Sequence, residues 1–358
     1  MKIIKHGFVS PKAKNHFRYN AWPTVITLHD GTLLAAWSGE RMKHVCPFGK
    51  VMAARSVDGG YTWLPPYCIQ DLTIDDRDAG LLHIGNRVLM TSFTNDRKLQ
   101  REYMERKNHI PSSPERKAFI SAYLDMITDE DERMCGPTLA VSMDNGYTFS
   151  DPVLMPLSSP HGPTLLRDGS ILMVGRNYDF DRGDFVNKIS AVLLDAEGRT
   201  LCEPWTVAEA PREGVIWCEP HAAEMPNGDI LVAIRCDDKP ANMRTLYLCR
   251  STDGGRTFST PQPTGWDGYP AHIFVHSSGA VVLTYSRRLA PEGIRARLSY
   301  DNGYTFGEEI VLRDDGLDWD LGYPSTAENG KGQLVTVYYM KEQEGTDENR
   351  IQFTLWEL

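Results

Sequence analysis

Short runs in which apolar and polar residues alternate recur along the whole chain, and they predict β-strands. Four of these strands end in the same turn, Ser-x-Asp-x-Gly-x-Thr-aromatic, which we call the Asp turn. The four Asp turns occupy residues 56–63, 142–149, 251–258 and 299–306. Their Asp-Gly and Asn-Gly steps supply the positive φ angles of a tight hairpin, and the Asp side chain can accept hydrogen bonds from the backbone that follows. Four copies with one spacing predict a repeated β-sheet architecture.

A second repeat alternates with the first and consists of two apolar strands around a turn that contains Gly. Its six copies begin near Trp22, Asp78, Gly162, Glu219, Tyr269 and Tyr323, and all but the second carry a proline at the start. Six inner hairpins predict an all-β fold, a six-bladed β-propeller with four-stranded antiparallel blades, which takes up residues 1–358 as one domain. We expect residues 3–9 to pair with the C-terminal strand, because this closure leaves no open sheet edge.

One segment, residues 97–133, interrupts the pattern within blade two. It is charged and helical in character, and Ser113 with Pro114 is typical of a helix start. Phe119, Tyr123 and Met126 would share one face of this helix. We expect this helical insertion to act as a lid or as a contact in a homo-oligomer.

Composition narrows the classes of partner and compartment. The net charge is −10 and no block of Lys and Arg stands out, so a nucleic-acid partner is not expected. No apolar run approaches the roughly 20 residues of a membrane span, and the N-terminus has no apolar signal-peptide core. The seven cysteines contain no C-x-x-C pair, which favours reduced thiols and a cytoplasmic protein. An exported form would look the same if the chain were truncated.

Candidate functional residues follow from propeller geometry. The inner strands start, and the second strands end, on one face, whereas the Asp turns lie on the opposite face. We therefore interpret the Asp-turn carboxylates as structural. The inner-strand starts supply Trp22, Asp76, Arg77, Asp78, His161, Glu219, His221, Tyr269, His272 and Tyr323, and the second-strand ends supply Arg41, Arg176, Arg235, Arg287 and Arg288. Converging arginines predict an anion-binding site, and the alternative is a set of salt bridges between blades.

These motifs resemble the sialidase (neuraminidase) family, whose propellers carry Asp-box (BNR) repeats. The residues from Glu219 to Arg235, the Gly-Tyr-Pro-Ser that contains Tyr323, the Ser-Gly-Glu-Arg that ends at Arg41, and Asp78 are similar to the family's site segments. The resemblance implies a Tyr323 nucleophile with Glu219 as its base. It also implies that Arg235, Arg287 (or its neighbour Arg288) and either Arg176 or Arg41 bind the substrate carboxylate.

The sequence departs from the family at two positions. Ala21 stands where the family has its first carboxylate-binding arginine, and the loop 42–50 lacks the carboxylate that serves as general acid. His44, Asp76 or Asp78 could take that role. These departures leave a different acidic or neutral sugar open as the substrate.

The histidines at the inner-strand starts are His161, His221 and His272. They could hold a metal, bind substrate or pack in the core, and their unequal offsets favour substrate binding or core packing over a metal. We therefore expect no metal and no cofactor. Three functions remain for this carbohydrate-binding chain. They are an exo-acting hydrolase similar to sialidases, a non-catalytic sugar-binding propeller, and a glycosidase or lyase for another sugar that uses Asp or His groups.

Overall fold

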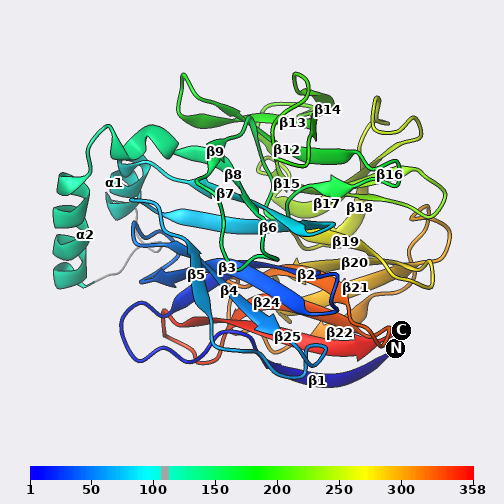
Figure 1. Cartoon of the computed structure of the whole chain (residues 1–358), viewed down its shortest axis with the longest axis horizontal. Helices are drawn as coiled ribbons and strands as arrows, with labels where there is room; N and C mark the ends of the chain where they lie inside the picture. The colour runs from blue at the N-terminus through cyan, green and yellow to red at the C-terminus, as the bar shows by residue number, and fades with distance from the viewer. Residues whose placement is uncertain (106–112) are drawn as a thin grey trace.

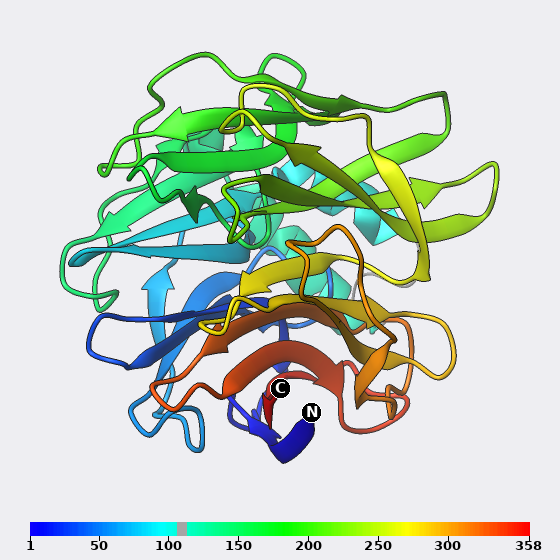
Figure 2. The ribbon, with the colours of Figure 1, turned by 90° about the vertical axis from the view of Figure 1, so that its right-hand side faces the viewer.

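The computed structural model describes residues 1–105 and 113–358, and it is built almost entirely from antiparallel strands arranged around a central axis (Figures 1 and 2). Four sheets are separate blades of four or five strands. They contain β6 (Asp76–Ile84), β7 (Arg87–Thr94), β8 (Gly136–Ser142) and β9 (Val153–Leu154); β10 (Leu157–Ser158), β11 (Thr164–Leu165), β12 (Ile171–Asp179), β13 (Asp184–Leu194) and β14 (Trp205–Glu209); β15 (Val215–Glu224), β16 (Ile230–Asp238), β17 (Met243–Ser251) and β18 (Gln262–Asp267); and β19 (Ala271–Val275), β20 (Val281–Arg287), β21 (Gly293–Ser299) and β22 (Ile310–Arg313).

The remaining sheet has eight strands and joins the two ends of the chain. It contains β1 (Lys2–Phe8), β2 (Tyr19–Thr27), β3 (Leu33–Arg41), β4 (Lys50–Ser56), β5 (Tyr67–Gln70), β23 (Gly322–Glu328), β24 (Leu334–Lys341) and β25 (Asn349–Glu357). Its halves meet where Tyr19 of β2 pairs with Asn349 of β25. Four blades are therefore separate sheets, whereas this bridge joins the first and last groups of strands into one sheet. The expected pairing of β1 with β25 is confirmed, and the two termini lie side by side (Figure 1).

Apolar clusters fill the spaces between neighbouring sheets. One cluster packs Trp22 and Trp37 of the first strands against Phe353 near the C-terminus, and all three side chains are about 1% exposed. The aromatic residues that close the Asp turns, such as Trp63 and Phe149, pack against these clusters from the rim. Burying a large apolar side chain stabilises the fold by about 1.5–3 kcal/mol, so the repeats bind neighbouring blades together.

The Asp turns owe their uniform shape to one hydrogen-bond pattern. In the turn at 142–149, Asp144 accepts bonds from Ser142 Oγ at 2.8 Å, from the Thr148 backbone N–H at 2.9 Å and from Thr148 Oγ1 at 2.7 Å. The other three Asp turns repeat these bonds. Residual burial opposes ionisation of Asp144, but its hydrogen bonds outweigh that effect and lower its pKa to about 2.

Strand pairing places the Asp turns at the end of the sheets away from Arg41. In the pairing of β3 with β4, Leu33 faces Ser56 and Gly39 faces Lys50. The turn after Ser56 therefore lies where β3 begins, and Arg41 lies where β3 ends. The predicted separation of Asp turns from the second-strand ends follows directly from this register.

Two helices and a short 3-10 helix lie between β7 and β8, within the predicted insertion 97–133. They are α1 (Arg97–Glu105), α2 (Pro114–Met126) and η1 (Asp131–Met134), and residues 106–112 of the predicted insertion lie outside the described residues. Ser113 caps α2 by accepting a bond from the Arg116 N–H at 3.2 Å. Ile120 and Leu124 pack against the loop after β3, whereas Phe119 and Met126 are 52% and 74% exposed. Phe119 and Tyr123, two of the residues expected to share a face, lie against Phe48 of the same loop.

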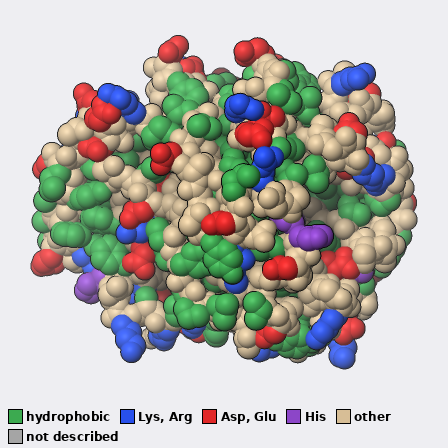
Figure 3. All heavy atoms as spheres, viewed as in Figure 1, with side chains coloured by type: hydrophobic (Ala, Val, Ile, Leu, Met, Phe, Trp, Pro, Cys, Tyr) green, Lys and Arg blue, Asp and Glu red, His purple; other side chains and the backbone are tan. Residues whose placement is uncertain are grey.

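Surface charge is mixed on the face seen in Figure 3, where basic and acidic side chains alternate without a broad basic area. Within residues 1–105 and 113–358, no helix is long and apolar enough to cross a membrane.

Candidate active site

Four of the inner strands share an irregularity close to their first residues. The register with the next strand shifts in β2, β6, β15 and β23. Inside each shift one non-glycine residue has a positive φ, and these are Trp22 at +56°, Asp78 at +45°, Glu219 at +50° and Tyr323 at +50°. A left-handed non-glycine residue costs about 1–3 kcal/mol and is held only where the surrounding structure enforces it. The same bulge therefore recurs at equivalent positions of four inner strands.

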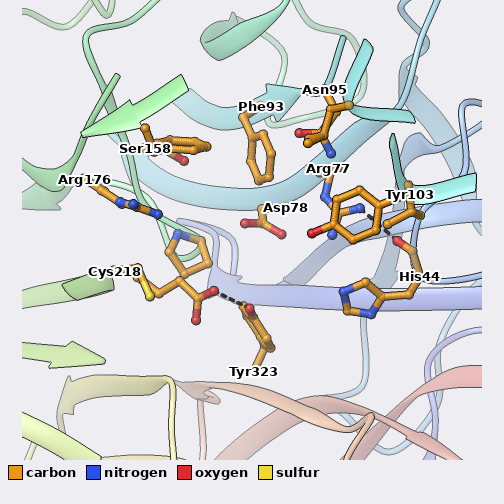
Figure 4. A pocket seen from close by; sticks show the side chains of 15 residues that line it. His44, Arg77, Asp78, Phe93, Asn95, Tyr103, Ser158, Arg176, Cys218 and Tyr323 are labelled. Carbon is orange, nitrogen blue, oxygen red and sulfur yellow. Dashed lines mark hydrogen bonds between the residues drawn. The ribbon is translucent and has the colours of Figure 1, made fainter. Parts of the chain in front are cut away.

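A cavity of about 290 Å³ lies at this end of the axis (Figure 4). Its walls come from β6, β7, β12, β13, β15, β23 and helix α1, and they include Asp78, Glu219 and Tyr323. The volume is at the lower end of the range for small-molecule sites, and it suits one sugar residue. Three of the four bulge residues therefore line a single pocket.

Tyr323 and Glu219 form the shortest contact in this cavity. Tyr323 Oη donates to Glu219 Oε1 at 2.6 Å, although the two residues are 104 positions apart in the chain. Arg235 Nη1 donates to both oxygens of the same carboxylate, at 2.9 and 2.8 Å. Burial first, and then the charge of Glu219, raise the pKa of Tyr323 well above its usual value. The phenol is therefore protonated at neutral pH, and its proton points at a base.

Asp78 faces the same cavity without a hydrogen-bond donor or a salt-bridge partner among the described residues. Burial raises its pKa to about 7, with the Arg77 charge acting against the shift and Glu219 adding to it. A carboxyl group that is half protonated near neutral pH can both give and take a proton. Of the carboxyl groups that the sequence proposed as general acid, Asp78 is the one in the cavity.

Asp76, the neighbouring candidate, points away from the cavity and serves the fold. Its carboxylate accepts bonds from Gln70 Nε2 at 2.9 Å, Thr94 Oγ1 at 3.2 Å and the Leu72 N–H at 2.7 Å. Its exposed fraction is 0%. The proposed substrate-binding role of Asp76 is therefore corrected, because the side chain is fully buried and both of its oxygens accept hydrogen bonds inside the protein.

The candidate arginines divide into two groups by their partners. Arg41 is fully buried and forms a 2.6 Å ion pair with Asp75, so it supports the fold rather than the substrate. Arg77 lies 3.7 Å from the same carboxylate, stacks on Trp22 at 3.9 Å and lines the cavity. Arg176 also lines the cavity, and its Nε donates to the Val186 carbonyl at 3.1 Å.

Arg287 does not reach the site, and Arg288 takes the place predicted for it. The Arg287 guanidinium bonds the carbonyl of Leu289 at 3.3 Å and lies 3.8 Å from Glu309. Arg288 is half-buried beside the ring of Tyr323, 5.6 Å from its centroid, and its Nη2 donates to Tyr339 Oη at 3.4 Å. Arg287 is the last residue of β20 and Arg288 follows it, and the two side chains contact different neighbours.

His44 lines the cavity, and its imidazole ring is held by hydrogen bonds to Tyr19 and Asp320. Its Nδ1 lies 2.8 Å from Tyr19 Oη and 3.3 Å from Asp320 Oδ1, and Tyr19 donates to Asp320 at 2.9 Å. Burial opposes ionisation of Asp320, but bonds from His44 and Tyr19 outweigh it and hold its pKa well below the usual range. The Asp320 carboxylate therefore fixes the orientation of the imidazole ring.

The three inner-strand histidines are placed together, but not in the cavity. His161, His221 and His272 lie within 4.3–5.6 Å of one another, ring centroid to ring centroid, and line a separate channel of about 540 Å³ along the axis. His221 Nδ1 accepts the Ile273 N–H at 3.0 Å. Burial lowers the pKa of all three. Their proposed contact with substrate in the cavity is therefore corrected, because they sit deeper on the axis.

Trp22 and Tyr269 border the site without entering this cavity. Trp22 is 1% exposed and supports Arg77 from below. Tyr269 lies under Arg235 at 4.1 Å and lines an adjacent hollow of about 550 Å³ with Arg288 and Trp319.

Several lining residues had no signal in the sequence. Phe93 and Phe185 are aromatic ends of β7 and β13, and Leu99 and Tyr103 come from α1. Asp320 stands three residues before Tyr323, and that proximity was the only hint of its role. In the described part of the chain, no three His, Cys, Asp or Glu side chains gather in a way that could hold a metal.

Comparisons with known proteins identify the family of the chain and solved structures with a similar fold. A family model described as the BNR repeat-like domain matches residues 118–336, which is more than half of the chain. No curated protein sequence matches the chain. A protein of unknown function from Dyadobacter fermentans is similar in structure, with a TM-score of 0.77, 22% identity, and 100% of this chain and 99% of that chain covered.

Two sialidase structures are also similar. A sialidase from Streptococcus pneumoniae gives a TM-score of 0.67 at 10% identity, with 98% of this chain and 70% of that chain covered. An intramolecular trans-sialidase from Ruminococcus gnavus gives 0.60 at 14% identity, with 97% and 95% covered. At these identities the likeness shows the all-β propeller fold.

Proposed function

The chain belongs to the BNR repeat-like domain family, and from that premise we propose that it is an exo-acting glycoside hydrolase that releases a terminal, acidic sugar from a glycan. The observation that carries the proposal is the 2.6 Å hydrogen bond from Tyr323 to Glu219. The same cavity holds the carboxyl group of Asp78, which has no hydrogen-bond or ion-pair partner among residues 1–105 and 113–358. A nucleophile bonded to its base, with an acid across the pocket, is the arrangement that covalent glycoside hydrolysis requires.

The first step forms a glycosyl-enzyme bond. Tyr323 Oη attacks the anomeric carbon while its proton passes to Glu219, and the bond to the leaving oxygen breaks as Asp78 donates its proton to that oxygen. A phenol suits this position because a third carboxylate beside Glu219 and Asp78 would be repelled and would resist ionisation. The raised pKa of Tyr323 means that the proton leaves during the attack, not before it.

The second step returns the enzyme to its starting state. Asp78, now a carboxylate, takes a proton from water, and the water oxygen attacks the anomeric carbon. The bond from that carbon to Tyr323 breaks, and the phenolate recovers its proton from Glu219. Arg235 holds the Glu219 carboxylate in place through both steps, because it binds both of its oxygens.

The test is a panel of aryl glycosides, including a sialoside, assayed with the wild type and with Tyr323→Phe and Glu219→Gln. We expect each variant to lose activity by about 10²–10⁴-fold, the range of nucleophile and general-base losses. Tyr147→Phe, an exposed tyrosine of an Asp turn, is the matched control and should keep full activity. Turnover that survives in Tyr323→Phe would rule out the nucleophile, whereas a Tyr323-linked sugar seen by mass spectrometry would support it.

A sugar-binding propeller without catalysis is the second candidate. The observation that favours it is Ala21, fully buried where the family resemblance implies a carboxylate-binding arginine. Saturable binding of a glycan with no turnover of any glycoside would support this candidate over the hydrolase.

The blade count belongs to the same proposal. A single residue pair, Tyr19 with Asn349, joins the two halves of the eight-stranded sheet. We infer that these halves are two four-stranded blades and that the propeller has six in total.

A further inference from the structure

We propose that the substrate carries its negative charge on a ring substituent away from the reacting carbon, as a carboxylate or a sulfate ester, and that Arg77 and Arg176 bind it. This inference rests on the proposed function, because it takes the cavity to be the sugar site and Tyr323 to mark the anomeric carbon. It names the substrate class as uronic acids or sulfated sugars.

The arginine beside the nucleophile is already neutralised. Arg235 Nη1 bonds Glu219 at 2.8 Å, and its Nη2 bonds Asp237 at 2.9 Å. Two carboxylates therefore share one guanidinium group, and few N–H donors remain for a ligand. Arg288 adds one charge near Tyr323, but its Nε and Nη2 are used by the Leu321 carbonyl and by Tyr339. This wall of the site has no excess of positive charge.

The opposite wall has such an excess. Arg41 and Arg77 share one carboxylate, Asp75, at 2.6 and 3.7 Å. Arg176 has no carboxylate within 4.0 Å among the described residues, and its hydrogen bond to the Val186 carbonyl uses Nε. Arg77 and Arg176 line the cavity, and with Arg41 they bring three guanidinium groups to the two carboxyl groups of Asp75 and Asp78. Uncompensated positive charge in a partly closed pocket attracts anions strongly.

The geometry directs this charge into the cavity. Figure 4 shows Asp78 between Arg77 and Arg176, with Tyr323 on the other side of the pocket. Arg77 is 7% exposed, and its Nε is buried without a hydrogen-bond partner in the described part of the chain. A buried donor without a partner is costly unless a ligand satisfies it. Asp78 does not compete for the arginines when it is protonated.

A planar carboxylate or a sulfate fits donors of this kind, because guanidinium groups bind such anions through paired N–H bonds. A sugar seated with its anomeric carbon at Tyr323 would place a substituent from the far side of its ring at this wall. A sugar with its carboxylate on the anomeric carbon would instead place that charge beside Glu219 and Asp237, where it would be repelled.

The experiment measures binding without turnover, by calorimetry on the Tyr323→Phe variant, which keeps the Glu219–Arg235 pair. The probes are glucuronate, galacturonate and glucose 6-sulfate, their neutral partners glucose and galactose, and N-acetylneuraminate. We expect at least one anionic probe to bind ten-fold or more tightly than its neutral partner. Carboxylate and sulfate probes separate the two sources of charge.

Adding Arg176→Gln should remove most of that preference and leave binding of the neutral partner within about two-fold. Arg199→Gln, an exposed arginine paired with Asp195, is the control and should change neither. The inference is overturned if the preference survives Arg176→Gln, if N-acetylneuraminate binds best and depends on Arg288, or if no probe binds. If the protein shows an Arg176-dependent preference but hydrolyses no glycoside, the inference is upheld and the hydrolase proposal is refuted. If it hydrolyses a glycoside without this preference, the hydrolase proposal is upheld and the inference is refuted.

Discussion

Asp144 and Asp78 carry the same carboxyl group at opposite ends of the propeller strands, and their acidities differ widely. Asp144 in an Asp turn accepts three hydrogen bonds from Ser142 and Thr148 and has its pKa lowered to about 2. Asp78 at the inner-strand bulge accepts none from the described residues, and burial raises its pKa to about 7. The two carboxyl groups are chemically identical, so the difference between their pKa values comes from their exposure to solvent and from the hydrogen-bond donors around them.

The backbone shows the same contrast. Asn145 and Asp78 both have positive φ angles, at +61° and +45°. In the Asp turn this angle is a routine feature of a tight hairpin, and asparagine tolerates it. At the site it occurs within a strand, in four repeats, and it aims side chains at the axis. Together these comparisons indicate that the Asp-turn end of the strands stabilises the fold, whereas the opposite end, with the bulges, carries the candidate site.

The largest effect we expect is on activity, from Asp78→Asn. Loss of the proton donor should lower kcat by about 10²–10⁴-fold for a glycoside with a poor leaving group. The loss should shrink for an activated aryl leaving group, which needs little protonation. Asp144→Asn should leave kcat unchanged with either substrate. An equal loss with both leaving groups in Asp78→Asn would contradict the role of acid.

The next effect concerns the pH dependence of stability. Asp78 has a higher pKa in the folded state, about 7, than in the unfolded chain, so the folded state holds the extra proton between pH 4 and 7. The contribution of Asp78 to the free energy of unfolding is therefore largest below about pH 4, and it is lost as the pH rises through 7. The free energy of unfolding of Asp78→Asn should rise relative to that of the wild type across this pH range, by up to about 4 kcal/mol. Denaturant unfolding at pH 5 and pH 8 measures this gain, and a constant difference between the proteins would contradict it.

A smaller effect follows from Asp144→Asn, with the opposite sign in pH. Asp144 has a lowered pKa, so its stabilising contribution is present above about pH 4 and is lost as the pH falls toward 2. The group is largely exposed, so solvent screening limits the loss to about 1 kcal/mol near neutral pH. Thermal unfolding would detect it as a lower Tm at pH 7, with the gap between variant and wild type closing at pH 2. A gap that widens in acid would be inconsistent with this account.

The smallest effect is expected from Asn145→Gly. The corresponding positions in two other Asp turns are Gly59 and Gly254, with φ of +79° and +74°. Glycine adopts this angle freely, and the Asn145 contact with Arg55 uses its backbone carbonyl. The free energy of unfolding should therefore change by less than about 0.5 kcal/mol. A larger change in a chemical unfolding curve would show that the Asn145 side chain contributes to the rim.

Much of the site was predictable from local sequence, because each blade repeats one plan. The repeats place Glu219 and Tyr323 at equivalent positions of two blades, and the resemblance to sialidases pairs them. The sequence could not separate Arg287 from Arg288, because the two are adjacent and only their contacts in the folded chain show which one lies beside Tyr323. It also could not show that Arg41 forms an ion pair with Asp75, since that ion pair joins two blades.

The sequence by itself determined the strands, the Asp turns and the closure by β1, because these depend on local φ preferences and on alternation along the chain. Tertiary structure alone decided that the first and last groups of strands share one sheet, and which carboxylates are ionised. It also decided which arginines keep donors for a ligand, and it set the three histidines in the channel rather than in the cavity. Burial and charge compensation depend on neighbours from distant parts of the chain, so no local pattern records them.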